Sequence, residues 1–158
     1  MKKDIFIDCQ IACKFASTKD PHLKELIDWL LKKDHENPAD RAFLMLSPML
    51  RKEYDGGNKN CFKEFSILTI IIKMQQDDRI NFKKKEEIDE FKREYISKKQ
   101  WDKLNSKEND KDNIPLVFLS DRKMVLSEDE NFVEDLINFP KFGNEVSCSM
   151  NCQDFNYK

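Results

Sequence analysis

The chain alternates short apolar runs with helical patterns, and this alternation restricts its fold more than any other feature. IFI at 5–7, AFLML at 42–46 and MVL at 124–126 are continuous apolar runs. Runs this short are typical of strands that are buried on both faces. Strands that alternate with helices form a parallel sheet with helices packed against it. The sequence therefore predicts an α/β fold, a three-layer α/β/α sandwich with a mainly parallel central sheet.

Helix signals fill the segments between these runs. Asp20 precedes Pro21, the cap-then-proline pattern of a helix start, and leucines follow at helical spacing. Ser47 and Pro48 repeat the signal, and DGGN at 55–58 is expected to end that helix. The remaining helices are expected over residues 48–54, 62–76, 84–97 and 129–138.

Three segments are patterned less clearly. Residues 100–111 are polar and charged, which indicates an exposed loop or a frayed helix, and residues 114–119 are compatible with helix or strand. The 158 residues suggest one domain over 1–158, with a core at about 3–140. The polar tail, 141–158, is expected to add an edge strand or to be loose.

Composition excludes some classes of protein and site. The net charge of −2 gives no overall attraction to nucleic acid, so polyanion binding would need a local patch or bound metal ions. No apolar run approaches the ~20 residues of a membrane span, so we expect no membrane association and a cytoplasmic location. Five cysteines, an odd number, and no secretory signal indicate a reducing compartment. Two C-x3-C spacings without a nearby histidine favour reduced thiols over a zinc site.

Carboxylates follow two of the predicted strands directly. Asp8 ends the first, and Ser127, Glu128 and Asp129 follow the run at 124–126. Each aspartate alone is equally a good helix cap. The carboxyl ends of parallel strands, however, share one edge of the sheet, where ligands bind. Grouped carboxylates bind Mg²⁺ or Mn²⁺, and such an ion can activate water and orient a phosphodiester for hydrolysis.

These residues, taken in order, resemble the PIN-domain nucleases. IFID, a Glu on the third helix, NDKDNI and VLSEDENF carry the resemblance, which covers Lys3 to about Phe139. It implies a Rossmann-like sandwich and a Mg²⁺- or Mn²⁺-dependent endoribonuclease that leaves a 5′-phosphate. Many members are toxins of toxin–antitoxin pairs, so it also implies an RNA substrate and an antitoxin protein as partner.

The resemblance assigns a role to individual residues. The matching catalytic set is Asp8, Glu53, Asp112 and Asp129. Asp8, Asp112 and Asp129 would hold the metal, with Asp110 as a competitor for the place of Asp112. Ser127 matches a hydroxyl residue that can join the metal shell. Gln10 stands where the family has Asn, so its contact to metal or substrate would differ in reach.

Other interpretations stay open at this point. Arg122 and Lys123 precede the strand at 124–126 and would either contact substrate phosphate or form a solvated turn. Gln10 and the negative net charge are also compatible with a PIN-like module that binds RNA or protein with weak or no cleavage. An aspartyl-phosphate enzyme is disfavoured, because Gln10 occupies the place of its second Asp. The apolar segment 62–72 suggests a homodimer.

Overall fold

Five parallel strands form the centre of the molecule in a computed structural model, which describes residues 1–57 and 66–158. Their order is β3-β2-β1-β4-β5. The strands are β1 (Lys3–Ile7), β2 (Ala42–Leu46), β3 (Ile80–Phe82), β4 (Met124–Leu126) and β5 (Ser147–Ser149). Every strand pair is parallel, which confirms the predicted α/β class.

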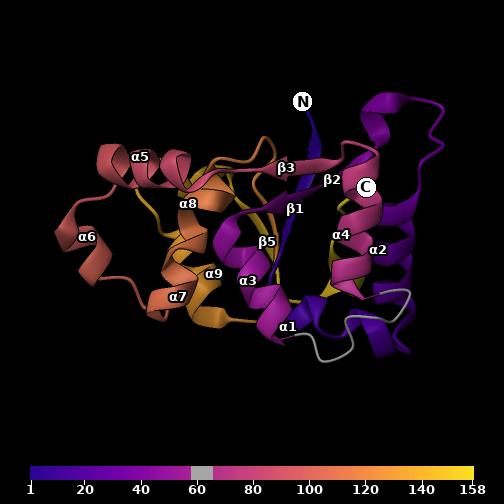
Figure 1. The fold of residues 1–158 in the computed structure, drawn as a ribbon. Coiled ribbons are helices and arrows are strands. Elements are labelled where there is room, and N and C mark those ends of the chain that lie inside the picture. Colours follow the sequence, from indigo (N-terminus) through magenta and orange to yellow (C-terminus); the bar gives the residue numbers. More distant parts are fainter. Residues whose placement is uncertain (58–65) are drawn as a thin grey trace.

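Helices cover both sides of this sheet, as Figure 1 shows. α2 and α4 pack together and against β2 on one side, while α8 and α9 lie on the other with α5 beyond them. The helices are α1 (Cys9–Ala12), α2 (Pro21–Leu31), α3 (Pro48–Gly57), α4 (Ile67–Gln76), α5 (Lys85–Tyr95), α6 (Lys98–Asp102), α7 (Glu108–Lys111), α8 (Asn113–Phe118) and α9 (Glu130–Ile137). Within residues 1–57 and 66–158, none is both long and apolar enough to cross a membrane.

β1 is the middle strand, and it anchors the core. Ile5 and Ile7 are fully buried, and the ring of Phe6 lies 5.5 Å from that of Phe132 on α9. Burial of each such side chain stabilises the fold by roughly 1.5–3 kcal/mol. β2 and β4 flank β1, with Ile5 opposite Leu44 and Ile7 opposite Leu126. The residue after Ile7 therefore lies at the centre of the carboxyl edge of the sheet.

The predicted caps hold the helices in place. The Asp20 side chain accepts a hydrogen bond from the amide of His22 at the start of α2. Ser47 Oγ accepts from the amide of Leu50 at 3.1 Å, so the signal before α3 is confirmed. These bonds satisfy amides that an uncapped helix would leave without a partner.

Several elements differ from the expectation. α3 continues through the predicted break and ends at Gly57. Segment 100–111 contains the end of α6 and all of α7, and Lys111 is buried. Two open assignments are settled: residues 114–118 belong to helix α8, one of the two alternatives, and the tail supplies the expected edge strand, β5. β3, with three residues, was not predicted at all.

α4 accounts for the apolar segment that suggested a dimer. The proposed helix start at 62–65 lies outside the described residues, and α4 begins at Ile67 after the cap Ser66. Ile67, Ile70 and Ile71 are fully buried within the chain, whereas Ile72 is 53% exposed. The apolar character of α4 is thus largely explained by packing within one molecule.

Candidate carboxylate site

β1 and β4 bring Asp8 and Ser127 together at the carboxyl edge of the sheet. The amide of Asp8 donates to the carbonyl of Leu126 at 2.9 Å, which continues the parallel ladder past the strand ends. Ser127 Oγ then donates to Asp8 Oδ2 at 2.5 Å. Asp8 is only 9% exposed and Ser127 is fully buried. The predicted pairing of these two strand ends is therefore present.

Asp129 lies two residues beyond Ser127 and has two roles. Its carboxylate caps α9 by accepting from the amide of Phe132 at 3.2 Å. Its own amide donates to Ser127 Oγ at 3.1 Å, which links it to Asp8 through one hydroxyl. The negative charge of Asp129 raises the pKa of Asp8. Asp129 can therefore cap α9 and also lie beside Asp8.

Glu53 approaches the same place from α3. Tyr54, the next residue, is fully buried, and its hydroxyl donates to the carbonyl of Ile7 at 2.5 Å. Cys9 Sγ donates to the carbonyl of Glu53 at 3.3 Å. These two bonds fix α3 against the end of β1. Asn113 Nδ2 lies 3.4 Å from each carboxylate oxygen of Glu53 and orients the side chain.

Asp110 and Asp112, the two competitors for the third acidic position, differ in their surroundings. Asp112 forms an ion pair with Lys92 on α5 and makes no side-chain cap bond to α8. Asp110 makes no such pair, and its pKa is raised by burial and then by the charges of Asp8 and Asp129. Asp110 therefore fits the third position better, which revises the expectation for Asp112. We call Asp8, Glu53, Asp110 and Asp129 the carboxylate cluster.

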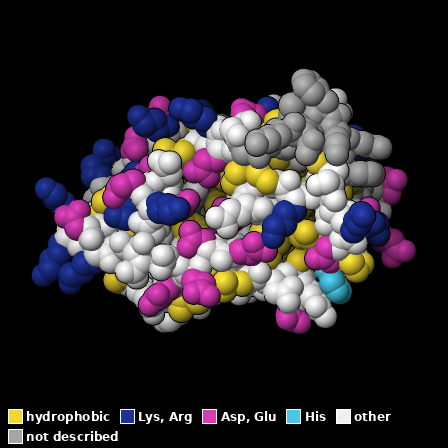
Figure 2. Space-filling view, turned by 90° about the horizontal axis from the view of Figure 1, so that it is seen from below, with side chains coloured by type: hydrophobic (Ala, Val, Ile, Leu, Met, Phe, Trp, Pro, Cys, Tyr) yellow, Lys and Arg dark blue, Asp and Glu magenta, His cyan; other side chains and the backbone are white. Residues whose placement is uncertain are grey.

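The members of the carboxylate cluster disfavour one another's charge. Burial is the largest cause that raises the pKa of Asp8, and the Ser127 hydroxyl acts in the opposite direction. Burial raises the pKa of Glu53 to about 7, with Asn113 opposing and Asp110, Asp8 and Asp112 adding to the increase. Among the described residues, no Lys or Arg forms an ion pair with the cluster. Acidic side chains gather across this face in Figure 2, so it favours a bound cation.

The donor chemistry fits a hard divalent cation. Carboxylate and hydroxyl oxygens are what Mg²⁺ and Mn²⁺ prefer. In the part of the chain that the structure describes, no three His, Cys, Asp or Glu side chains stand close enough to enclose an ion together. Mg²⁺ usually retains several waters and uses one or two carboxylates plus substrate phosphate, so it does not need such a trio.

Gln10 is exposed on α1, and its backbone hydrogen-bonds to Asp8, so a contact of its side chain with metal or substrate stays a prediction. Two other supporting residues lie away from the cluster. Arg122 and Lys123 precede β4 and thus lie at the opposite, amino-terminal edge of the sheet. Arg122 donates there to the carbonyls of Asp4 and Tyr157, and Lys123 pairs with Glu145 at 3.0 Å. Contact of this pair with a phosphate at the cluster was therefore a wrong expectation, because strand direction separates them.

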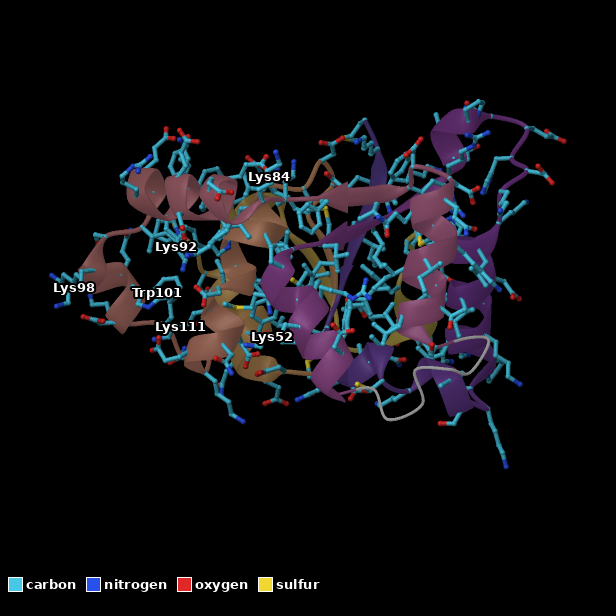
Figure 3. The ribbon with its side chains drawn as sticks, in the orientation of Figure 1. Lys52, Lys84, Lys92, Lys98, Trp101 and Lys111 are labelled. Atoms are coloured by element: carbon cyan, nitrogen blue, oxygen red, sulfur yellow. The ribbon has the colours of Figure 1, made fainter. Side chains whose placement is uncertain are left out.

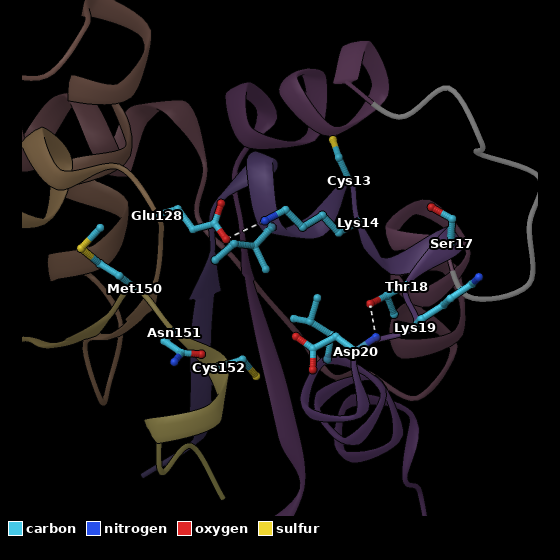
Figure 4. A pocket seen from close by; sticks show the side chains of 12 residues that line it. Cys13, Lys14, Ser17, Thr18, Lys19, Asp20, Glu128, Met150, Asn151 and Cys152 are labelled. Atoms are coloured by element: carbon cyan, nitrogen blue, oxygen red, sulfur yellow. Dashed lines mark hydrogen bonds and ion pairs between the residues drawn. The ribbon is translucent and has the colours of Figure 1, made fainter.

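A pocket of about 510 Å³ adjoins the cluster, between α1 and residues 150–152. Its walls include Ile11, three residues after Asp8, and Glu128, between Ser127 and Asp129. Figure 4 shows Lys14 reaching across to Glu128, and their charged atoms lie 2.6 Å apart. The pocket thus offers space for part of a ligand beside Glu128, which follows Ser127 directly.

Sequence reasoning missed the residues that position the carboxylates. Asn113 follows Asp112 within NDKDNI, so its amide was visible next to an assigned residue. Tyr54 follows Glu53 in the same way, but its bond to Ile7 depends on how α3 crosses β1. Cys9 looked incidental in sequence, yet its thiol contacts the Glu53 backbone. The signal that the sequence offered for these three residues is that each directly follows an assigned acidic residue.

Substitution of Glu53 by Gln should stabilise the metal-free protein at alkaline pH. The pKa of Glu53 in the folded protein, about 7, exceeds the ordinary value of 4.5. The contribution of Glu53 to the free energy of unfolding is therefore fully present below pH 4.5 and is lost as pH rises through 7. At pH 8 we expect Glu53→Gln to gain on the order of 1–2 kcal/mol in unfolding free energy, discounted for partial exposure. Urea unfolding at pH 4 and pH 8 measures this, and an equal effect at both values would contradict it.

Comparison with protein-family models, with curated proteins and with solved structures found no match to this chain. The candidate site therefore rests on its own geometry and chemistry.

Proposed function

We propose that the protein is a metal-dependent endoribonuclease that hydrolyses RNA at the carboxylate cluster. The single observation that carries this proposal is the convergence of carboxylates from β1, α3, α7 and α9 on one edge of a parallel sheet, without a cationic partner in the described chain. Such a site binds divalent cations better than it binds an anionic substrate alone. The resemblance to PIN-domain nucleases in the order of these residues supports RNA as the substrate.

Each residue has a role that follows from its contacts. Asp8, together with Asp110 or Asp129, would hold Mg²⁺ or Mn²⁺ whose remaining ligands are waters and substrate phosphate, and the Ser127 hydroxyl fixes the orientation of Asp8. The bound ion would lower the pKa of a water and neutralise charge on the phosphate. Glu53, with its raised pKa, can accept or supply a proton at its carboxylate near neutral pH. Asn113 holds that carboxylate in position.

Incubation of the purified protein with a structured RNA and Mn²⁺ tests the proposal. We expect internal cleavage that leaves 5′-phosphate ends, that stops with a chelator, and that is abolished when Asp8→Asn is combined with Asp129→Asn. Both substitutions remove charge but keep side-chain size, so the fold should persist, as circular dichroism would show.

Two outcomes would contradict the proposal. The first is that folded wild-type protein does not cut RNA with Mg²⁺ or Mn²⁺. The second is that cleavage survives the double substitution, which would place the chemistry elsewhere or in a contaminant. Binding of RNA without cleavage would favour the alternative of a PIN-like binding module.

A further inference from the structure

α5, α6 and α7 form an arm, residues 85–111, that extends from one end of the molecule (Figure 1). We call residues 97–107 the tip of this arm. The tip contains four lysines and one acidic residue, Asp102, which gives a net charge of +3 within a chain of net −2. The lysines are Lys98, Lys99, Lys103 and Lys107; all four are exposed, and no ion pair to them occurs in the described residues.

The arm is held in place by specific contacts. The Lys92 and Lys111 ammonium groups lie 4.5 and 5.8 Å from the ring centre of Trp101, and Figure 3 shows them on either side of it. The amides of Asn105 and Ser106 donate to the carboxylate of Asp135 on α9 at 2.9 and 2.8 Å. These contacts secure both α6 and the loop after it. The tip lysines are therefore presented from a fixed backbone.

The Lys92–Asp112 ion pair adds a third attachment. It joins α5 to the start of α8, close to where Asn113 contacts Glu53. Asp112 thus has a positioning role, because its ion pair holds α5 against the start of α8, next to Asn113.

The tip and the carboxylate cluster share one face of the molecule. Lys107 directly precedes α7, and its charge acts on Asp110, three residues later. Figure 2 shows acidic side chains across the middle of this face and basic ones gathered at the end where α5 and α6 lie. A polyanion that reaches the cluster would be repelled there and attracted at the tip.

We propose that the tip of the arm binds the phosphate backbone of the RNA strand whose scissile phosphate lies at the carboxylate cluster. The inference rests on the proposed function, since it names how that substrate is held. Exposed lysines without ion pairs release condensed counterions when they meet phosphates, which supplies affinity independent of sequence. RNA is favoured over an acidic protein segment because the tip adjoins a site suited to phosphate chemistry.

RNA binding without cleavage tests this surface separately from the chemistry. Fluorescence anisotropy would use a labelled, unstructured single-stranded RNA in EDTA, with wild type and a tip variant carrying Lys98→Gln, Lys99→Gln and Lys103→Gln. We expect affinity at low salt to fall about tenfold or more. The slope of log K against log salt should fall by about 2, because each phosphate that a lysine neutralises on single-stranded RNA contributes ~0.7 to it.

A matched variant controls for net charge. Lys2, Lys24 and Lys32 are exposed and belong to no ion pair in the described residues. Lys2 precedes β1 at the amino-terminal edge of the sheet, and Lys24 and Lys32 lie within and after α2, away from the arm. Their replacement by Gln removes the same charge and should change RNA affinity less than twofold. Gln is a good helix former, so α6 should persist in the tip variant, and equal melting temperatures would verify this.

The outcomes separate this inference from the proposed function. Equal weakening by the tip and control variants, or no weakening by either, overturns the tip as an RNA-binding surface. Tip-dependent binding by a protein that cuts no RNA leaves this surface standing while the nuclease proposal fails. If the tip variant keeps its RNA affinity but no longer binds a polyglutamate peptide that wild type binds, the surface is a protein-binding one and the inference fails.

Discussion

Replacing Asp110 by Asn should lower the rate of RNA cleavage on the order of 100-fold or more, whereas Asp112→Asn should retain most of it. Asp110 lies within electrostatic range of Asp8 and Asp129 and forms no ion pair in the described residues, with Lys107 only partly opposing the increase in its pKa, so its carboxylate is available to a metal. Asp112 already pairs with Lys92. Loss of a residue that takes part in the chemistry costs about 10²–10⁴-fold, whereas a partly exposed ion pair contributes about 1 kcal/mol or less.

Single-turnover cleavage with Mn²⁺ and enzyme in excess compares the two variants. Each variant is the control for the other, because both replace an aspartate by asparagine and the two positions are two residues apart. We expect Asp112→Asn to reduce the rate less than about tenfold, through displacement of the arm. If Asp112→Asn is inactive and Asp110→Asn is active, the account is contradicted and Asp112 is the third acidic residue of the site.

Replacing Asp4 by Ala should lower the free energy of unfolding by about 3–5 kcal/mol. Asp4 is fully buried at the start of β1 and accepts from Asn81 Nδ2 at 2.7 Å and from the amides of Asp121 and Arg122 at 2.9 and 3.0 Å. Its removal leaves buried donors without an acceptor, which costs the desolvation of each.

Urea denaturation measures this loss, and Asp121→Ala is the control. Asp121 is exposed and, within residues 1–57 and 66–158, its carboxylate accepts only from the amide of Lys2, so its replacement should change stability by about 0.5 kcal/mol or less. The rate of cleavage per folded Asp4→Ala molecule should equal that of wild type, since Asp4 lies at the edge opposite Asp8. A loss below about 1 kcal/mol would contradict this role of Asp4.

The sequence predicts the residues that strand direction alone determines. Asp8 and Ser127 follow β1 and β4 directly, so a parallel sheet places them side by side whatever the helices do. The same rule places Arg122 and Lys123 away from Asp8, because residues that precede a parallel strand lie at the opposite edge of the sheet. This part of the expectation could have been corrected from the sequence, once the sheet was taken as parallel.

Helix-borne residues are harder to place from sequence. Asp110 lies within α7 and Asp112 is the single residue between α7 and α8, so the relative orientation of their side chains depends on how these two short helices meet. What distinguishes the two residues is the ion pair of Asp112 with Lys92 on α5, a contact between separate elements that sequence does not show. β3 escaped prediction because three residues give no periodicity, and burial of Lys111 depends on Trp101 from another helix.

Isothermal titration calorimetry of the metal-free protein with Mn²⁺ tests the central claim most directly. The carboxylate cluster should bind Mn²⁺ saturably in wild type and lose that binding when Asp8→Asn is combined with Asp110→Asn. A folded wild-type protein that binds no Mn²⁺, or a double variant that binds it equally well, would contradict a metal site at this edge of the sheet.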